Sequence, residues 1–149
     1  MEQGRLILLV EDNPDDQLLI RRALSKDRVK SQIFIANDGL EALDYLFRHG
    51  KFTDRDPLLV PGLVILDLNV PKVSGLEVLQ EIRKNATTRF LPVIIFSSSR
   101  EERDVLDGYQ LGANSYVIKP VDSKEFEEAV RQLGTYWLSL NELVPPHKA

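Results

Sequence analysis

The chain has 149 residues, of which 43% are hydrophobic and 28% charged, and its formal net charge is −4. This length suits one domain with a substantial core, and the composition is ordinary for a soluble globular protein. The acidic balance argues against broad nucleic-acid binding, and the absence of cysteine excludes disulfides, thiolate metal sites and cysteine nucleophiles.

The N-terminal half predicts two strands, each followed by a helix. The apolar run at residues 5–10 suits a parallel strand buried on both faces. It is too short for a signal peptide or a membrane span, so we expect a cytoplasmic protein. Asn13 is a plausible N-cap of the first helix, and a second strand at residues 31–36 precedes the second helix. Residues 48–62 lack a clear period and contain two prolines and two glycines, which predicts a long, inserted loop.

The C-terminal half repeats the strand–helix pattern three times. Strands are predicted at residues 63–67, 92–96 and 115–118. Each is followed by a capping sequence that opens a helix: Ser74-x-x-Glu77, Ser98-x-x-Glu101 and Asp122-x-x-Glu125. Such alternation implies one parallel sheet with helices on both faces, joined by right-handed crossovers.

Polar side chains that can take part in phosphoryl chemistry end four of the predicted strands: Glu11 and Asp12, Asp67, Ser97, and Lys119. Ligands of open α/β sheets bind beyond the carboxyl ends of the strands. Carboxylates that converge there repel one another unless a cation is present, and Mg²⁺ prefers oxygen ligands. A lysine and a hydroxyl can hold a phosphoryl group beside that metal. Each residue alone could be a cap or loop residue. Their joint placement favours a site for phosphoryl chemistry.

Four segments of the sequence resemble the response-regulator receiver family over nearly the whole chain: LLVEDNPDD (8–16), VILDLNVPKVSGLEVL (64–79), PVIIFSSS (92–99) and DGYQLGANSYVIKP (107–120). The resemblance implies an α/β, flavodoxin-like fold, with a doubly wound five-stranded parallel sheet of order 2-1-3-4-5. It also implies a stand-alone regulator that receives a phosphoryl group from a sensor histidine kinase and acts on a downstream protein. Such a protein catalyses only its own phosphorylation and dephosphorylation.

The resemblance assigns a role to each residue of the site. Asp67 would be the phosphoacceptor and, with Asp12, a direct ligand of Mg²⁺. Glu11 would act on the metal through water, and Asn69 would supply its backbone carbonyl. Lys119 would contact the phosphoryl group.

The same resemblance implies a conformational switch. Ser97 would be the switch hydroxyl and Tyr116 the switch aromatic, which would turn inward and remodel the face formed by the fourth helix, fifth strand and fifth helix. The bond before Pro120 would be cis, an uncommon feature. Neither His49 nor His147 is placed to carry a phosphoryl group, and both are expected to be solvated.

The loop at residues 48–62 and the lengthened C-terminus resemble the small regulators paired with bacterial, especially cyanobacterial, phytochrome histidine kinases. We expect one domain over residues 1–149, with a core at about 5–133, an apolar extension at 134–144 and a disordered tail at 145–149. Exposed apolar residues usually mark an interface. The extension therefore predicts a homodimer, with the inserted loop as a further contact and with Tyr136, Trp137 and Leu140 as candidate interface residues.

Three other classes of protein fit the sequence less well. A phosphatase of the haloacid-dehalogenase type needs a general acid where this chain has Asn69, which cannot protonate a leaving group. A nucleotide-binding module needs a glycine-rich phosphate loop that the sequence lacks. No residues of this chain remain for a DNA-binding domain, so DNA is not an expected partner. A membrane is not expected either, because the apolar run at residues 5–10 is too short to span one. A pseudo-receiver that binds proteins without phosphorylation stays open as the alternative.

Overall fold

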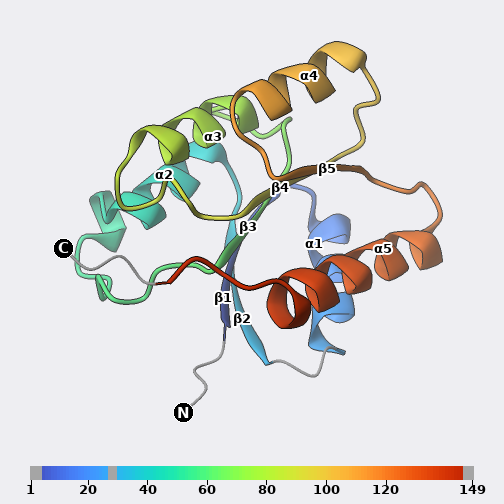
Figure 1. The fold of residues 1–149 in the computed structure, drawn as a ribbon, viewed down its shortest axis with the longest axis horizontal. Coiled ribbons are helices and arrows are strands. Elements are labelled where there is room, and N and C mark those ends of the chain that lie inside the picture. Colours follow the sequence, from blue (N-terminus) through green and yellow to red (C-terminus); the bar gives the residue numbers. More distant parts are fainter. Residues whose placement is uncertain (1–4, 27–29, 146–149) are drawn as a thin grey trace.

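A computed structural model describes residues 5–26 and 30–145 of the chain. A five-stranded sheet of order β2-β1-β3-β4-β5 forms its centre, and every neighbouring pair is parallel (Figure 1). The order predicted from the resemblance is therefore confirmed. Residues 146–149, which hold most of the predicted disordered tail and His147, lie outside the described residues. The strands are β1 Arg5–Val10, β2 Ser31–Ala36, β3 Leu63–Leu66, β4 Val93–Ser97 and β5 Ser115–Ile118.

Helices cover both faces of the sheet, as Figure 1 shows. The helices are α1 Pro14–Ser25, α2 Gly39–Phe47, α3 Gly75–Lys84, α4 Glu102–Gln110 and α5 Ser123–Thr135. Alternate residues of β1 point to opposite faces: Ile7 and Leu9 pack under α1 and α5, whereas Leu8 and Val10 pack under α2 and α3. Both faces are thus buried, which explains why the run in β1 is continuously apolar. No helix among the described residues is long and apolar enough to cross a membrane.

Most of the predicted helix starts are confirmed. The side chain of Asn13 accepts hydrogen bonds from the backbone N–H groups of the first turn of α1, and Asp38, Ser74 and Asp122 cap α2, α3 and α5 in the same manner. The prediction for Ser98 is wrong, because α4 begins at Glu102 and its N-cap makes no side-chain hydrogen bond.

The C-terminal segment is less separate from the core than predicted. Helix α5 runs on into a short π-helix, η2, at Tyr136–Leu140. Leu138 is 1% exposed and packs into the same cluster as α1 and α5, and half-buried Trp137 packs against that cluster. The core therefore continues past Gly134. Tyr136 and Leu140 remain exposed, at 48% and 73%.

One arginine makes several contacts that tie the loop between α2 and β3 to the end of α2. Arg55 donates hydrogen bonds from Nε to the backbone oxygen of Tyr45 at 2.8 Å and from Nη2 to that of Leu46 at 3.3 Å. Its guanidinium lies over the Tyr45 ring, 4.5 Å from the centroid, and also donates to the backbone oxygen of Leu59. These bonds satisfy carbonyls at the end of α2, so the loop is ordered although its sequence has no period.

Candidate functional site

The backbone of the sheet fixes the residues that follow its strands. The N–H of Glu11 donates to the oxygen of Ala36 at 3.0 Å, and the N–H of Asp67 donates to the oxygen of Val10 at 3.0 Å. The N–H of Lys119 donates in the same way to the oxygen of Ser97 at 2.8 Å. Parallel pairing thus extends beyond the strands and places the polar residues at one edge of the sheet, as predicted.

Three carboxylates meet at this edge. One carboxylate oxygen from each of Glu11, Asp12 and Asp67 lies within 4.8 Å of the others. Glu11 and Asp67 are buried, at 1% and 8% exposure, whereas Asp12 is exposed. Within the described part of the chain, the Asp12 carboxylate makes no hydrogen bond or ion pair. A hard oxygen donor set that is open to solvent on one side fits Mg²⁺, which keeps part of its water shell.

Lys119 donates to two carboxylates of this cluster and to a third carboxylate, Asp16, outside it. Its Nζ lies 2.7 Å from Glu11 Oε1, 2.8 Å from Asp16 Oδ2 and 3.0 Å from Asp67 Oδ2, and an ammonium group has three N–H donors. Sequence reasoning missed the contact of Asp16 with this lysine. Asp12 precedes the helix that carries Asp16, so no helical spacing in the sequence signals this contact.

Burial and charge shift the pKa values of two groups at the site. Burial raises the pKa of Glu11 to about 7, although the hydrogen bond and charge of Lys119 oppose the rise. Burial also disfavours the charge on Lys119, but hydrogen bonds to Asp16 and Glu11 outweigh this and hold the Lys119 pKa above its ordinary value. The lysine therefore stays cationic, while Glu11 is readily protonated when no metal is present.

The start of α3 packs directly on the backbone of Asp67. A Cβ on Gly75 would lie 2.3 Å from the Asp67 carbonyl oxygen, a distance that only a glycine avoids. The loop between β3 and α3 also folds back, since the N–H of Asn69 donates to Asp67 Oδ1 at 3.3 Å. These contacts orient the Asp67 side chain toward Lys119.

The predicted switch residues lie beside the cluster and share one neighbour. Ser97 is fully buried, and its Oγ accepts a hydrogen bond from the N–H of Ser99 at 3.2 Å. The Tyr116 ring is half-buried, and its hydroxyl donates to the backbone oxygen of Ser99 at 3.0 Å. Ser99 Oγ in turn donates to Asp104 in the first turn of α4, at 2.5 Å. One short loop therefore joins both residues to α4.

The prediction of a cis bond before Pro120 is wrong. No peptide bond in the described segments is cis. The trans isomer is the lower-energy form of an X–Pro bond by about 0.5–1 kcal/mol. With the trans bond in place, Lys119 reaches the carboxylates of Glu11, Asp16 and Asp67. His49 is exposed just after α2, as expected of a solvated residue.

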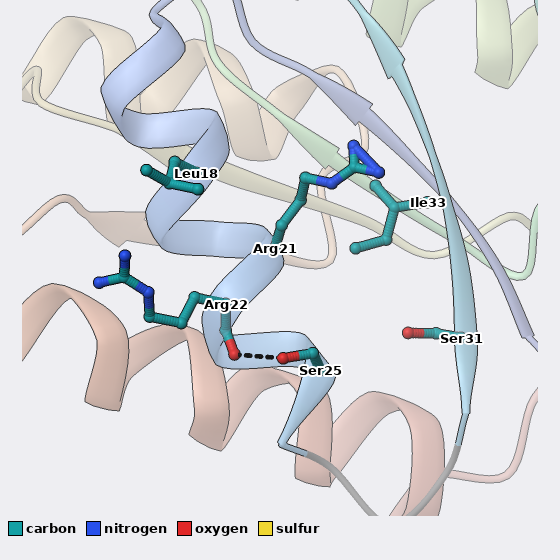
Figure 2. A pocket seen from close by; sticks show the side chains of 6 residues that line it. All are labelled: Leu18, Arg21, Arg22, Ser25, Ser31 and Ile33. Atoms are coloured by element: carbon teal, nitrogen blue, oxygen red, sulfur yellow. Dashed lines mark hydrogen bonds between the residues drawn. The ribbon is translucent and has the colours of Figure 1, made fainter.

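A separate groove lies on the side of α1 that faces the edge strand β2 (Figure 2). It has a volume of about 410 Å³ and contains none of the acidic cluster. One of its two arginines, Arg22, lies 3.7 Å from Glu127 on α5, so that charge is partly balanced. The groove is lined by Leu18, Arg21, Arg22, Ser25, Ser31 and Ile33.

Comparison with known proteins places the chain among relatives of similar length. The family described as the response regulator receiver domain matches residues 7–131. The chain is 35% identical to response regulator Rcp1 of Synechocystis sp. over 134 residues, which are 90% of this chain and 89% of Rcp1. The Mn²⁺-bound form of Rcp1 superposes with a TM-score of 0.88 at 34% identity, over 94% of this chain and 99% of that one.

Two further solved structures are similar over almost the full length of both chains. The phosphorylated cyanobacterial phytochrome response regulator RcpA is 35% identical with a TM-score of 0.89, covering 95% of this chain and 99% of that one. The bacteriophytochrome response regulator AtBRR is 46% identical with a TM-score of 0.73, covering 95% of this chain and all (100%) of that one. With the family match and these similarities together, the chain belongs to the response regulator receiver family.

Proposed function

We propose that this chain is a stand-alone two-component response regulator that accepts a phosphoryl group on Asp67 from a histidine kinase in a Mg²⁺-dependent reaction. The observation that supports it most is the position of Asp67. Its carboxylate lies 3.0 Å from the Lys119 ammonium and shares a metal-sized space with Glu11 and Asp12. Transfer of a phosphoryl group depends mainly on positioning and on neutralised charge, and this arrangement supplies both.

In the proposed reaction, a carboxylate oxygen of Asp67 attacks phosphorus while the bond from phosphorus to the imidazole nitrogen of the donor breaks. The nitrogen keeps the electron pair of that bond and takes up a proton. A bound Mg²⁺, held by Asp12, Asp67 and the Asn69 carbonyl, with Glu11 acting through water, would neutralise charge on the transferring oxygens. Lys119 would also neutralise negative charge on these oxygens.

We propose that Ser97 and Tyr116 transmit the change to α4. The Ser97 hydroxyl can donate to a phosphoryl oxygen, but its present hydrogen bond holds it to the N–H of Ser99. A move of Ser97 toward the phosphoryl group would release that bond. Ser99 also binds the Tyr116 hydroxyl and Asp104, so the β5 face and α4 would adjust together.

The proposed kinase is of the phytochrome type. The names of RcpA and AtBRR connect both with phytochromes, and each matches this chain over nearly its whole length. Such a partner would place the protein in the cytoplasm. Phosphotransfer from a purified bacterial phytochrome kinase, compared with an unrelated histidine kinase, tests the pairing; equal transfer from both would contradict it.

Incubation with acetyl phosphate and Mg²⁺, followed by intact-mass measurement, tests the acceptor. Wild type should gain one phosphoryl group, and Asp67→Asn, or wild type with excess EDTA, should gain none. A gain on both proteins would refute the assignment of Asp67. A gain on neither would favour the pseudo-receiver.

We also propose that the protein forms a homodimer through an apolar surface made by the inserted loop and the C-terminal segment. Leu143 reaches to 3.6 Å from the position that a Cβ on Gly62 would take, so the two segments lie side by side (Figure 1). Their exposed apolar residues include Leu58, Leu59, Val60, Leu140 and Val144. An apolar surface spread over two adjoining segments is typical of an interface.

Because Leu138 is buried, truncation after Gly134 would damage the core, and a surface substitution tests the dimer better. Leu140→Glu should convert a dimer to a monomer in analytical ultracentrifugation. Leu18→Glu, which changes another exposed leucine outside this surface, should leave the dimer intact. A monomeric wild type, or a dimer in both variants, would contradict the interface.

A further inference from the structure

The ammonium group of Lys119 is saturated by carboxylates. Its three N–H donors face Glu11 at 2.7 Å, Asp16 at 2.8 Å and Asp67 at 3.0 Å. A fourth carboxylate, that of Asp12, lies near Glu11 and Asp67 but not against the lysine. Any new acceptor at this position must therefore share the lysine with groups that already bind it.

Asp16 differs from the other two acceptors. The Glu11 and Asp67 side chains are 2% and 10% exposed, whereas the Asp16 side chain is 23% exposed. Asp16 also lies on the first turn of α1 and is not one of the three carboxylates that gather around the candidate metal position. Water can solvate a released Asp16 carboxylate, while a released Glu11 or Asp67 would remain buried with only one backbone N–H as a partner.

We propose that Asp16 is a positioning residue that holds Lys119 in the unphosphorylated state and competes with the phosphoryl group for that lysine. This inference rests on the proposed phosphorylation of Asp67. A phosphoryl group on Asp67 adds anionic oxygens that need donors, and one Lys119 donor is bound by Asp16. The negative charge of Asp16 also offsets the positive charge that Lys119 offers to an incoming phosphate.

Competition between Asp16 and the phosphoryl group for Lys119 predicts how the phosphorylation rate changes when the Asp16 charge is removed. When acetyl phosphate is the donor, the phosphorus–oxygen bond to acetate breaks with its electron pair on acetate, and a bond from phosphorus to an Asp67 oxygen forms. Lys119 stabilises the anionic oxygens during this step only as far as its donors are free. Removal of the Asp16 charge should therefore accelerate phosphorylation about fivefold, the size expected of one partly exposed charge-assisted hydrogen bond.

Asp15 provides a matched control. It precedes Asp16 in the same helical turn and carries the same charge, but it is exposed and its carboxylate binds nothing within the described residues. Asp15→Asn and Asp16→Asn thus change the net charge and the helix terminus alike. Only Asp16→Asn removes the negative charge of a group that binds Lys119.

Two measurements on wild type and both variants test the proposal. In metal-free protein, nitrogen-15 NMR should detect the Lys119 ammonium in wild type and Asp15→Asn, and its protons should exchange faster with water in Asp16→Asn. At saturating Mg²⁺ for each protein, intact mass should show phosphorylation by acetyl phosphate about fivefold faster in Asp16→Asn and nearly unchanged in Asp15→Asn. Asp16→Glu, which restores a carboxylate, should return the rate toward that of wild type.

The possible outcomes separate the two proposals. Phosphorylation of wild type with equal rates in the two Asn variants, or a slower rate in Asp16→Asn, would overturn the competition and leave the acceptor assignment standing. Unchanged ammonium exchange in Asp16→Asn would overturn it as well. No added mass on any protein would overturn the proposed function, and the competition with it.

Discussion

Because burial raises the pKa of Glu11 to about 7, Mg²⁺ affinity should depend on pH in the physiological range. A carboxylate must be ionised to take part in binding a metal, so protons compete with Mg²⁺ below the pKa. With a pKa near 7, the ionised fraction of Glu11 is about 0.1 at pH 6 and about 0.9 at pH 8. Affinity should therefore rise about tenfold from pH 6 to pH 8.

Isothermal titration of metal-free protein with Mg²⁺ at both pH values measures this change. Two buffers of different ionisation enthalpy at pH 7 should also reveal about half a proton released for each ion bound. Glu11→Gln removes the titrating group, so this variant should bind Mg²⁺ more weakly but with little dependence on pH. Equal wild-type affinities for Mg²⁺ at pH 6 and pH 8 would refute the role given to Glu11. An unchanged dependence of Mg²⁺ affinity on pH in Glu11→Gln would refute it as well.

Three further predictions concern the scaffold around the site. Gly75→Ala should destabilise the protein by about 1–3 kcal/mol in urea unfolding, because the added methyl group meets the Asp67 carbonyl; no loss would contradict that close packing. Leu138→Ala should cost about 2–5 kcal/mol, whereas Leu18→Ala, at an exposed residue outside the proposed dimer surface, should stay within about 0.5 kcal/mol; similar losses in both would show that Leu138 is not part of the core. Arg55→Lys should make the inserted loop more sensitive to limited proteolysis, since a compact ammonium cannot span the separate carbonyls of Tyr45 and Leu46 and lie over the Tyr45 ring as the planar guanidinium does; unchanged cleavage would assign the order of the loop to other contacts.

The sequence predicts the sheet well because its central strands, β1, β3 and β4, are buried on both faces. A short, continuous apolar run such as that at residues 5–10, followed by a helical segment, is typical of a parallel strand, and the repeated alternation of such elements favours one parallel sheet. The carboxyl ends of such strands must meet at one edge, which is why Glu11, Asp67 and Lys119 could be grouped without coordinates.

Features that depend on the placement of a helix against the sheet could not be predicted in this way. The contact of Asp16 with Lys119 requires α1 to start beside the end of β5, and no local pattern encodes that distance. Helix α4 starts at Glu102, later than predicted, and it is Ser99 and not Ser98 whose side chain bonds there, to the N–H of Glu101 and to Asp104. Leu138 looked like part of an exposed extension because periodicity alone does not reveal where a core ends.

Locating the phosphoryl group on the chain is the sharpest test of whether Asp67 is the acceptor. Borohydride reduces an aspartyl phosphate to homoserine, which peptide mass spectrometry can assign to a single residue after treatment with acetyl phosphate and Mg²⁺. Homoserine is expected at position 67 in wild type, and at no position when Mg²⁺ is removed. Homoserine at another aspartate, or none anywhere while the protein remains folded and Mg²⁺-bound, would contradict it.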